Sequence, residues 1–190
     1  MSKQVTDKLL IVFLDSPLSV DAQEVSAWDQ SLFEQVEEHT CEVARSVDAR
    51  RHVYYSSEII EDDRWSRTRF IKYKQSEGDK GERLKEAFRN GFKKGYGRIV
   101  CIGVCCGDIH TQDIQKAFDL LNTRNAVMGP STNGGYYLLG LSSPFEPIFD
   151  EKPWGKDTLF KKTYLELMMY NKSIALLEEK VMKSAKDIVV

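Results

Sequence analysis

Short apolar runs alternate along this chain with segments whose apolar residues recur at helical spacing, and this alternation strongly constrains the fold. Lys8–Leu14 is an apolar run of strand length, as expected in a sheet that is covered on both faces. Residues 21–47 instead place Val25, Trp28 and Leu32 three or four positions apart, which is typical of an amphipathic helix. The chain is therefore expected to alternate β-strands and α-helices.

The rest of the chain continues this alternation. The further expected strands are residues 51–56, 69–73, 98–103, 126–128, 136–141 and 173–177, and the further expected helices run from about 84 to 95, from a cap at Thr111, and over 156–170. This order predicts an α/β fold with a mostly parallel sheet and helices on both faces. Ligands of such sheets lie at the carboxyl ends of the strands, so the loops after Leu14, Tyr73 and Gly103 are the expected floor of a site.

Bulk properties limit the classes of function. A length of 190 residues with 42% hydrophobic content predicts one domain over residues 1–190 with a full core. A net charge of -2 gives no electrostatic reason to expect nucleic acid as a partner. No apolar run approaches the roughly 20 residues that span a bilayer, and the N-terminal residues do not resemble a signal peptide. We therefore expect a cytoplasmic protein without a membrane span; the sequence does not predict its oligomeric state.

Three of the four cysteines, Cys101, Cys105 and Cys106, lie close together in sequence, which is a poor arrangement for structural disulfides. Their spacing with Asp108 and His110 could suggest zinc, but there is no C-x2-C pair and no second pair elsewhere. We therefore expect these cysteines to be ordinary thiols and not zinc ligands. We expect Cys101 to be buried within its strand and at least one of Cys105 and Cys106 to be accessible.

A glycine-containing loop leads into the second expected helix and is the candidate nucleotide-binding segment. Gly78 and Gly81 would let backbone amides approach a base or ribose closely, and Gln75 offers a donor and an acceptor to a base edge. The alternative is a simple glycine turn before a helix, with Asp79 or Glu82 supporting its N-terminus.

Four segments together resemble a known family. They are Q-x-x-G-D-x-G-E-R-x-x-x-A-F over residues 75–88, I-G-x-x-x-x-D ending at Asp108, G-P-x-x-x-G-G-Y-Y-L-x-G from Gly129, and W-x-x-x-T-x-x-x-x-T from Trp154. The combination resembles a bacterial family of glycosyltransferase-like proteins long catalogued as a domain of unknown function. That family is similar to the nucleotidyltransferases that act on molybdopterin and 2-phospholactate. The resemblance implies their GT-A nucleotide-diphospho-sugar transferase fold over most of the chain, from Leu9 to about Ile174.

The metal side departs from the family pattern. Where the family has the aspartate of I-G-x-D-x-P, whose carboxylate resembles a ligand of a divalent ion, this chain has Cys105, and Gly107 replaces the proline. Mg²⁺ and Mn²⁺ prefer hard oxygen ligands to a thiol. Asp108 could replace the missing aspartate only if the loop is rebuilt; otherwise it is a turn residue. Asn133 replaces the aspartate of the D-G-G-Y-Y motif, which keeps the turn but loses the charge.

Two other segments also differ from the family. The basic loop expected after the first strand is replaced by residues 15–21, which contain Asp15 and Asp21 and no base. The acidic motif near the C-terminus retains only Asp187 clearly. Three elements that would bind anions or metal are therefore altered together.

The resemblance implies a divergent glycosyltransferase-like or nucleotidyltransferase-like protein that binds a nucleotide or nucleotide sugar. With these replacements, metal-dependent transfer is expected to be weak or lost, no cofactor is expected, and no catalytic residue is assigned. Gln75, Gly78 and Gly81 are the candidate nucleotide residues; Cys105, Asp108 and Asn133 are the candidate remnants of the metal side. One alternative is an active enzyme with Mg²⁺ or Mn²⁺ at a rebuilt site, and a second is a structural or partner-binding pseudoenzyme.

Overall fold

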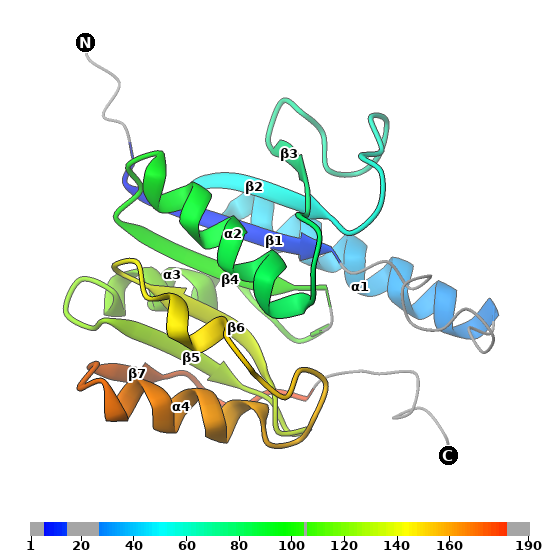
Figure 1. The fold of residues 1–190 in the computed structure, drawn as a ribbon. Helices are drawn as coiled ribbons and strands as arrows, with labels where there is room; N and C mark the ends of the chain where they lie inside the picture. Colours follow the sequence, from blue (N-terminus) through cyan, green and yellow to red (C-terminus); the bar gives the residue numbers. More distant parts are fainter. Residues whose placement is uncertain (1–5, 15–26, 105, 182–190) are drawn as a thin grey trace, which may run out of the picture.

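The computed structural model describes residues 6–14, 27–104 and 106–181, and its strands form a seven-stranded sheet (Figure 1). The strands are β1 (Lys8–Leu14), β2 (Arg50–Tyr55), β3 (Ile71–Lys74), β4 (Arg98–Gly103), β5 (Ala126–Pro130), β6 (Tyr136–Leu141) and β7 (Ile174–Leu176). Their order in the sheet is β3-β2-β1-β4-β6-β5-β7. β6 is antiparallel to its neighbours β4 and β5, and the other pairs are parallel. The predicted mostly parallel sheet is confirmed.

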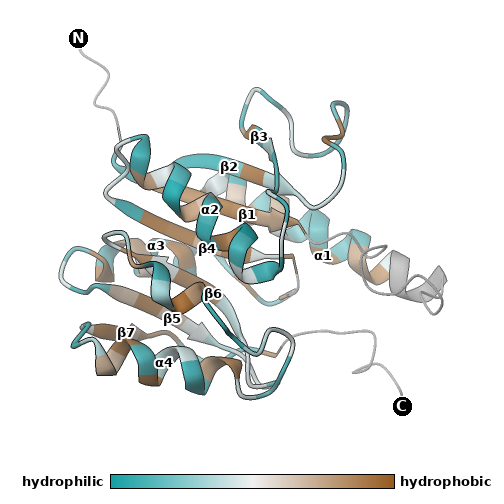
Figure 2. Cartoon of the chain, viewed as in Figure 1, coloured by the Kyte–Doolittle hydropathy of each residue, from teal (hydrophilic) through white to brown (hydrophobic). Residues whose placement is uncertain are grey.

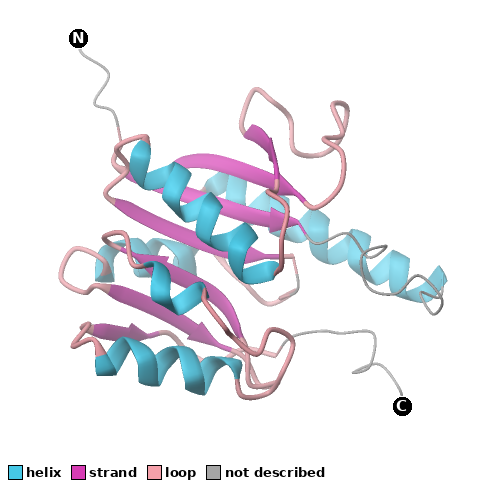
Figure 3. Ribbon diagram, in the orientation of Figure 1, coloured by secondary structure: helices cyan, strands magenta, loops and turns pink. Residues whose placement is uncertain are grey.

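Helices cover both faces of this sheet, as predicted (Figure 3). The helices are α1 (Ala27–Ser46), α2 (Lys80–Lys93), α3 (Thr111–Leu120) and α4 (Leu159–Met169). α1 and α3 pack on one face, and α2 and α4 pack on the other together with a short 3-10 helix, Glu146–Phe149. None of the described helices is long and apolar enough to cross a membrane.

Strand β1 shows why the sheet needs two helical layers. Leu10 and Val12 contribute to the core under α1 and α3, whereas Leu9 and Ile11 contribute to the core under α2 and α4. All four side chains are fully buried because successive residues of a strand point to opposite faces. Brown, hydrophobic positions accordingly concentrate on the central strands in Figure 2.

Three helix starts differ from the sequence predictions. α2 begins at Lys80 and not near residue 84, because Asp79 caps it by accepting the backbone N–H of Glu82 at 2.9 Å. The N-cap of α3 is His110 and not Thr111, because the Asp113 carboxylate accepts the backbone N–H of His110 at 2.8 Å. α4 begins at Leu159 and not at residue 156, because Gly155 has a positive φ of 73° and residues 153–158 form turns. The predicted start of the first helix, at residue 21, lies outside the described residues.

His52 of β2 is a titratable side chain buried in an aromatic cluster. It is 1% exposed, and both ring nitrogens are buried without a hydrogen-bond partner. The rings of Tyr54, Tyr73 and Tyr96 lie 6.4, 5.0 and 5.7 Å from it, centroid to centroid. Burial lowers the pKa of His52 to about 4, with smaller contributions from the nearby cationic groups of Lys94 and Arg50.

This burial makes the fold sensitive to acid. The unfolded chain binds a proton at His52 near pH 6.5 and the folded chain only near pH 4, so stability falls as the pH drops between these values. We expect His52→Phe, which cannot titrate, to remove about 3 kcal/mol of the stability lost between pH 7 and pH 4. Urea unfolding of both proteins at each pH measures the difference. If the unfolding free energies of the two proteins fell equally with pH, the folded chain would bind a proton at His52 as readily as the unfolded chain does.

Candidate functional site

A cavity opens at the carboxyl ends of β1 and β4, where the topology predicts a ligand site. Its wall combines Phe13 of β1, residues 101–103 of β4, the beginning of β6, the first two turns of α2, and residues 154–156. The cavity volume is about 190 Å³. Because ligand pockets usually measure about 300–1,000 Å³, this one would enclose only part of a nucleotide sugar.

Aromatic and aliphatic side chains make most of the cavity wall. They are Phe13, Leu84, Phe88, Tyr136, Leu139 and Trp154. Trp154 is the first residue of the W-x-x-x-T-x-x-x-x-T segment. The structure adds that this half-buried indole lines the cavity, and its Nε1 is buried without a hydrogen-bond partner.

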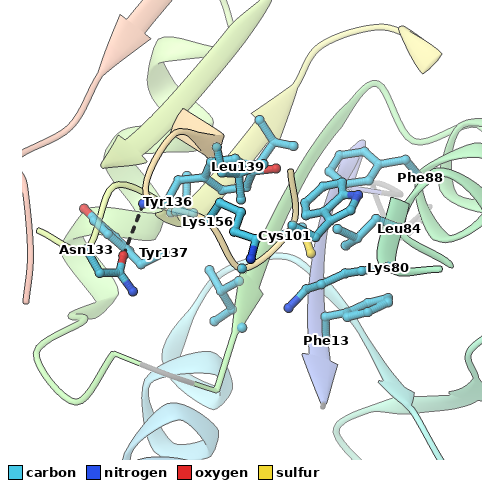
Figure 4. A pocket seen from close by; sticks show the side chains of 17 residues that line it. Phe13, Lys80, Leu84, Phe88, Cys101, Asn133, Tyr136, Tyr137, Leu139 and Lys156 are labelled. Carbon is cyan, nitrogen blue, oxygen red and sulfur yellow. Dashed lines mark hydrogen bonds between the residues drawn. The ribbon is translucent and has the colours of Figure 1, made fainter. Parts of the chain in front are cut away.

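Two lysines also line the cavity, and the sequence predictions missed both. Lys80 is the first residue of α2, and Lys156 lies in the turns before α4. Figure 4 shows their amino groups directed into the same space. Each lies inside a motif, but at a position that the motif leaves unspecified, so no sequence signal distinguished either lysine from a solvated surface charge.

Gln75, a candidate nucleotide residue, is 6% exposed at the end of β3. Its amide nitrogen donates to the carbonyls of Leu14 at 2.8 Å and Tyr54 at 3.1 Å, and its Oε1 accepts from Arg83 at 2.7 Å. The side chain therefore ties the ends of β1 and β2 to α2. Gln75 does not line the cavity, and contact with a base edge would require it to give up at least one of these bonds.

The two candidate glycines have structural reasons to be glycine. Gly78 has a φ of +106°, which side chains rarely adopt. A Cβ on Gly81 would lie 2.2 Å from the carbonyl oxygen of Phe149, so α2 can approach the 3-10 helix only without a side chain there. Neither glycine lines the cavity, whereas Lys80 between them does.

Among the candidate residues that the structure describes, Asn133 is the one that lines the cavity. Its Oδ1 accepts from the Ser131 hydroxyl at 2.7 Å and from the backbone N–H of Gly135 at 3.1 Å. The asparagine thus closes the turn before β6, as the sequence predicted for an aspartate replaced by asparagine.

Asp108, the candidate substitute for the family's metal ligand, does not line the cavity. Its side chain is 63% exposed, and a buried lysine, Lys180, approaches it. The Lys180 ammonium donates to the carbonyl oxygen of Asp108 at 2.8 Å and lies 3.7 Å from its Oδ2. It also pairs with Asp113 at 3.2 Å. A lysine therefore already supplies positive charge at these carboxylates.

The described residues do not fit a divalent cation here. A metal on Asp108 would lie close to the Lys180 ammonium, and Oδ1 of Asn133 already accepts two hydrogen bonds. Within residues 6–14, 27–104 and 106–181, no three His, Cys, Asp or Glu side chains gather as a possible metal site. Cys105, residues 15–21 and Asp187 lie outside the described residues.

The three described cysteines are free thiols and all are buried. Cys101 is buried within β4, as predicted. Cys106 is only 1% exposed, and burial raises the pKa of its thiol. The expectation of an accessible thiol in the Cys105–Cys106 pair therefore rests on Cys105, which is not described.

Comparison with known families identifies the chain. Residues 38–156, more than half of the sequence, match the family described as "Uncharacterized protein conserved in bacteria (DUF2064)". The chain belongs to this family. The family resemblance drawn from the four motifs is thereby confirmed. No curated protein matches the sequence.

Solved structures confirm the GT-A-like fold. One is the "putative nucleotide-diphospho-sugar transferase from Desulfovibrio desulfuricans G20", with a TM-score of 0.81 at 20% identity, over 94% of this chain and 83% of that one. A CMP:2-keto-3-deoxy-manno-octonic acid synthetase in complex with CTP has a TM-score of 0.52 at 11% identity, over 90% and 89%. Rv0371c of Mycobacterium tuberculosis in complex with manganese has a TM-score of 0.54 at 9% identity, over 96% of each chain.

Proposed function

We propose that this protein binds a nucleotide or nucleotide sugar at the cavity beside α2, and that its metal-dependent transfer is weak or lost. The position of the cavity carries the proposal. The cavity lies at the carboxyl ends of β1 and β4, next to β6, the strand that is antiparallel to its neighbours. Open α/β sheets bind ligands at the carboxyl ends of their strands, where the strand order changes. The similar folds of a nucleotide-diphospho-sugar transferase-like protein and of a CTP-bound synthetase support the ligand class.

The chemistry of the wall supports the same ligand class. Phe13, Phe88 and Trp154 offer apolar surface to a ring, and Lys80 and Lys156 offer positive charge to an anion. A nucleotide sugar combines both chemical features in one molecule.

The described residues of the metal side support the proposal that metal-dependent transfer is weak or lost. Asp108 and Asp113 are associated with Lys180, and Asn133 replaces a charged ligand with an amide. Without two hard carboxylates a divalent cation has no strong site in this arrangement. Transfer from a nucleotide sugar would then lack the charge that usually offsets the diphosphate leaving group.

Calorimetric titration with UDP-, CDP-, GDP- and ADP-sugars, each in EDTA and in Mn²⁺, tests the proposal. We expect saturable binding of at least one of them in EDTA, and a rise in unfolding free energy of about 2.7 kcal/mol at 100 times its Kd. Release of free sugar or its transfer to acceptors should not increase with Mn²⁺.

The variant Asp108→Asn is the matched control, since its exposed side chain changes charge without changing size. It should bind like the unmodified protein. Binding that requires Mn²⁺ and is lost in Asp108→Asn would instead indicate an active enzyme with a rebuilt metal site. Absence of binding in both conditions would contradict nucleotide recognition and favour a partner-binding role.

A further inference from the structure

Exposed apolar side chains gather at one edge of the sheet. Single exposed apolar residues are common on protein surfaces, whereas a cluster of them marks an interaction surface. The elements that carry the cluster, α4 and β7, lie at the lower edge of the sheet in Figure 1, and both show brown positions in Figure 2. Of the large apolar side chains that are exposed in the described chain, five lie within twelve consecutive positions: Leu165, Met168, Met169, Tyr170 and Leu176.

β7 is the last strand of the sheet, and among the described strands only β5 pairs with it. The carbonyl of Ser173 and the N–H of Leu177 hydrogen-bond to β5. Because the backbone groups of alternate residues point to opposite sides of a strand, those of Ile174 and Leu176 point out of the sheet. Edge strands are commonly protected from further pairing by lysine or proline, and the sequence Ile-Ala-Leu of β7 contains neither.

α4 presents an apolar flank to this edge. Its other flank faces the 3-10 helix, which also contacts α2: Glu166 pairs with Lys152 at 2.5 Å, and the ring of Tyr170 lies 5.1 Å from that of Phe145, centroid to centroid. Met168 lies about 160–200° around the helix axis from Glu166 and Tyr170. It therefore faces away from the 3-10 helix, on the side of α4 where the sheet ends at β7.

A second copy of this chain fits the same edge. If two β7 strands pair antiparallel about a two-fold axis at Ala175, Ile174 comes opposite Leu176 of the second copy, and their outward backbone groups can hydrogen-bond. In this register Lys172 comes opposite Glu178 of the second copy, and the two-fold axis repeats this pair of opposite charges. Neither Lys172 nor Glu178 makes an ion pair with another residue that the structure describes.

Charge also selects the position of the axis. With the axis at Leu176, Ile174 would come opposite Glu178, and Lys172 would come opposite Lys180. That register would place an apolar side chain against a charge and two like charges against each other, both of which are unfavourable across strands. The edge is therefore complementary to itself in one antiparallel register.

We propose that β7 and the adjacent flank of α4 form the interface of a two-fold dimer, in which antiparallel β7 strands join the sheets of two copies of this chain. The α4 helices of the two copies then lie on the same face of the joined sheet and bring their apolar flanks together. No residue from 165 to 178 lines the cavity, so this inference is independent of the proposed nucleotide function.

Sedimentation equilibrium of the full chain at a series of concentrations tests the dimer. We expect the mass of two chains at high concentration and of one chain on dilution. Leu176→Lys and Met168→Lys each place two ammonium groups in the interface, and each should raise the dimer Kd about 100-fold, that is, about 10-fold for each of two equivalent contacts. Both side chains are about half exposed, so the monomer should fold, and thermal unfolding checks this.

Met169→Lys is the matched control. It makes the same change one position further along α4, on the flank of Glu166 and at a more exposed side chain, and it should leave the Kd unchanged. Charge reversal tests the register without an apolar substitution. Lys172→Glu should raise the Kd about 10-fold, and adding Glu178→Lys to it should restore the original value, because opposite charges then face each other again.

Four outcomes would overturn the proposal. The mass of one chain at every concentration up to about 1 mM would exclude a dimer. A dimer with an unchanged Kd in Leu176→Lys and Met168→Lys would use another surface. An equal loss in Met169→Lys would contradict the assigned flank of α4. A loss in Lys172→Glu that Glu178→Lys does not restore would contradict the antiparallel register.

Discussion

Replacing Gly134 by alanine should lower the free energy of unfolding by about 2–5 kcal/mol and weaken binding at the cavity. Gly134 has a φ of +80°, and an added Cβ would lie 2.0 Å from the carbonyl oxygen of Asp157. The carbonyl of Gly134 also accepts the backbone N–H of Phe160 at 2.9 Å. An alanine would therefore push away the turns that carry Lys156.

Gly155→Ala is the matched control. Gly155 also has a positive φ, +73°, but a Cβ there would meet no atom within 4 Å. Its substitution should cost only the backbone strain, about 1–2 kcal/mol. Urea unfolding of the two variants measures the difference in stability, and titration of Gly134→Ala with nucleotide sugars tests its binding. Equal losses of stability would mean that the close approach of Gly134 to Asp157 is not maintained in solution.

Asp63→Ala should also destabilise the fold strongly, by about 3–5 kcal/mol, because it leaves a buried charge without its partner. The side chain of Lys72 has no exposed surface, and its ammonium lies 2.8 Å from Oδ1 of Asp63. The same ammonium donates to the carbonyls of Ile60 and Glu61 at 2.5 and 3.0 Å. This lysine therefore fixes the loop between β2 and β3 to the sheet.

Asp63 organises the same loop in two other ways. Its Oδ1 accepts the backbone N–H of Trp65 at 2.9 Å, and its Oδ2 accepts the hydroxyl of Tyr55 at 2.7 Å. Burial and this hydrogen bond raise the pKa of Tyr55. Removing the carboxylate thus leaves several buried groups unsatisfied, which adds to the expected loss.

Two further variants identify the cause of the Asp63→Ala effect. Adding Lys72→Met to it removes the unpaired charge and should recover part of the stability, so the two changes should not be additive. Glu61→Ala breaks an ion pair with Arg67 in the same loop, but both partners are exposed, so the urea midpoint should hardly move. A Glu61→Ala effect as large as that of Asp63→Ala would contradict the assigned role of the buried pair.

The sequence predicted the layout of the fold well, because strands and helices leave local patterns. Residues 98–103 and 136–141 were placed within their strands to the residue, since apolar runs of this length with β-branched and aromatic side chains are distinctive. Helix ends were less accurate. The capping by Asp113 and the turn at Gly155 depend on individual hydrogen bonds and φ angles, which periodicity does not encode.

The candidate site could be predicted only in part. Asn133 lines the cavity, whereas the side chain of Gln75 is bonded within the protein and Gly81 packs on Phe149. The nucleotide roles of Gln75, Gly78 and Gly81 remain predictions. The motif that contains them does reach the cavity, but through Lys80, Leu84 and Phe88, and Lys80 has no distinguishing signal in the sequence.

By itself, the sequence determined the family, the α/β class and the absence of a carboxylate at positions 105 and 133, because motifs, periodicity and residue identity are local properties. Only the tertiary structure decided which charges meet. It brings Lys180 to Asp108, Lys72 to Asp63, and Lys80 and Lys156 to one cavity. In each case the two residues come from different segments of the chain, and their approach depends on how the sheet orders its strands and positions its helices.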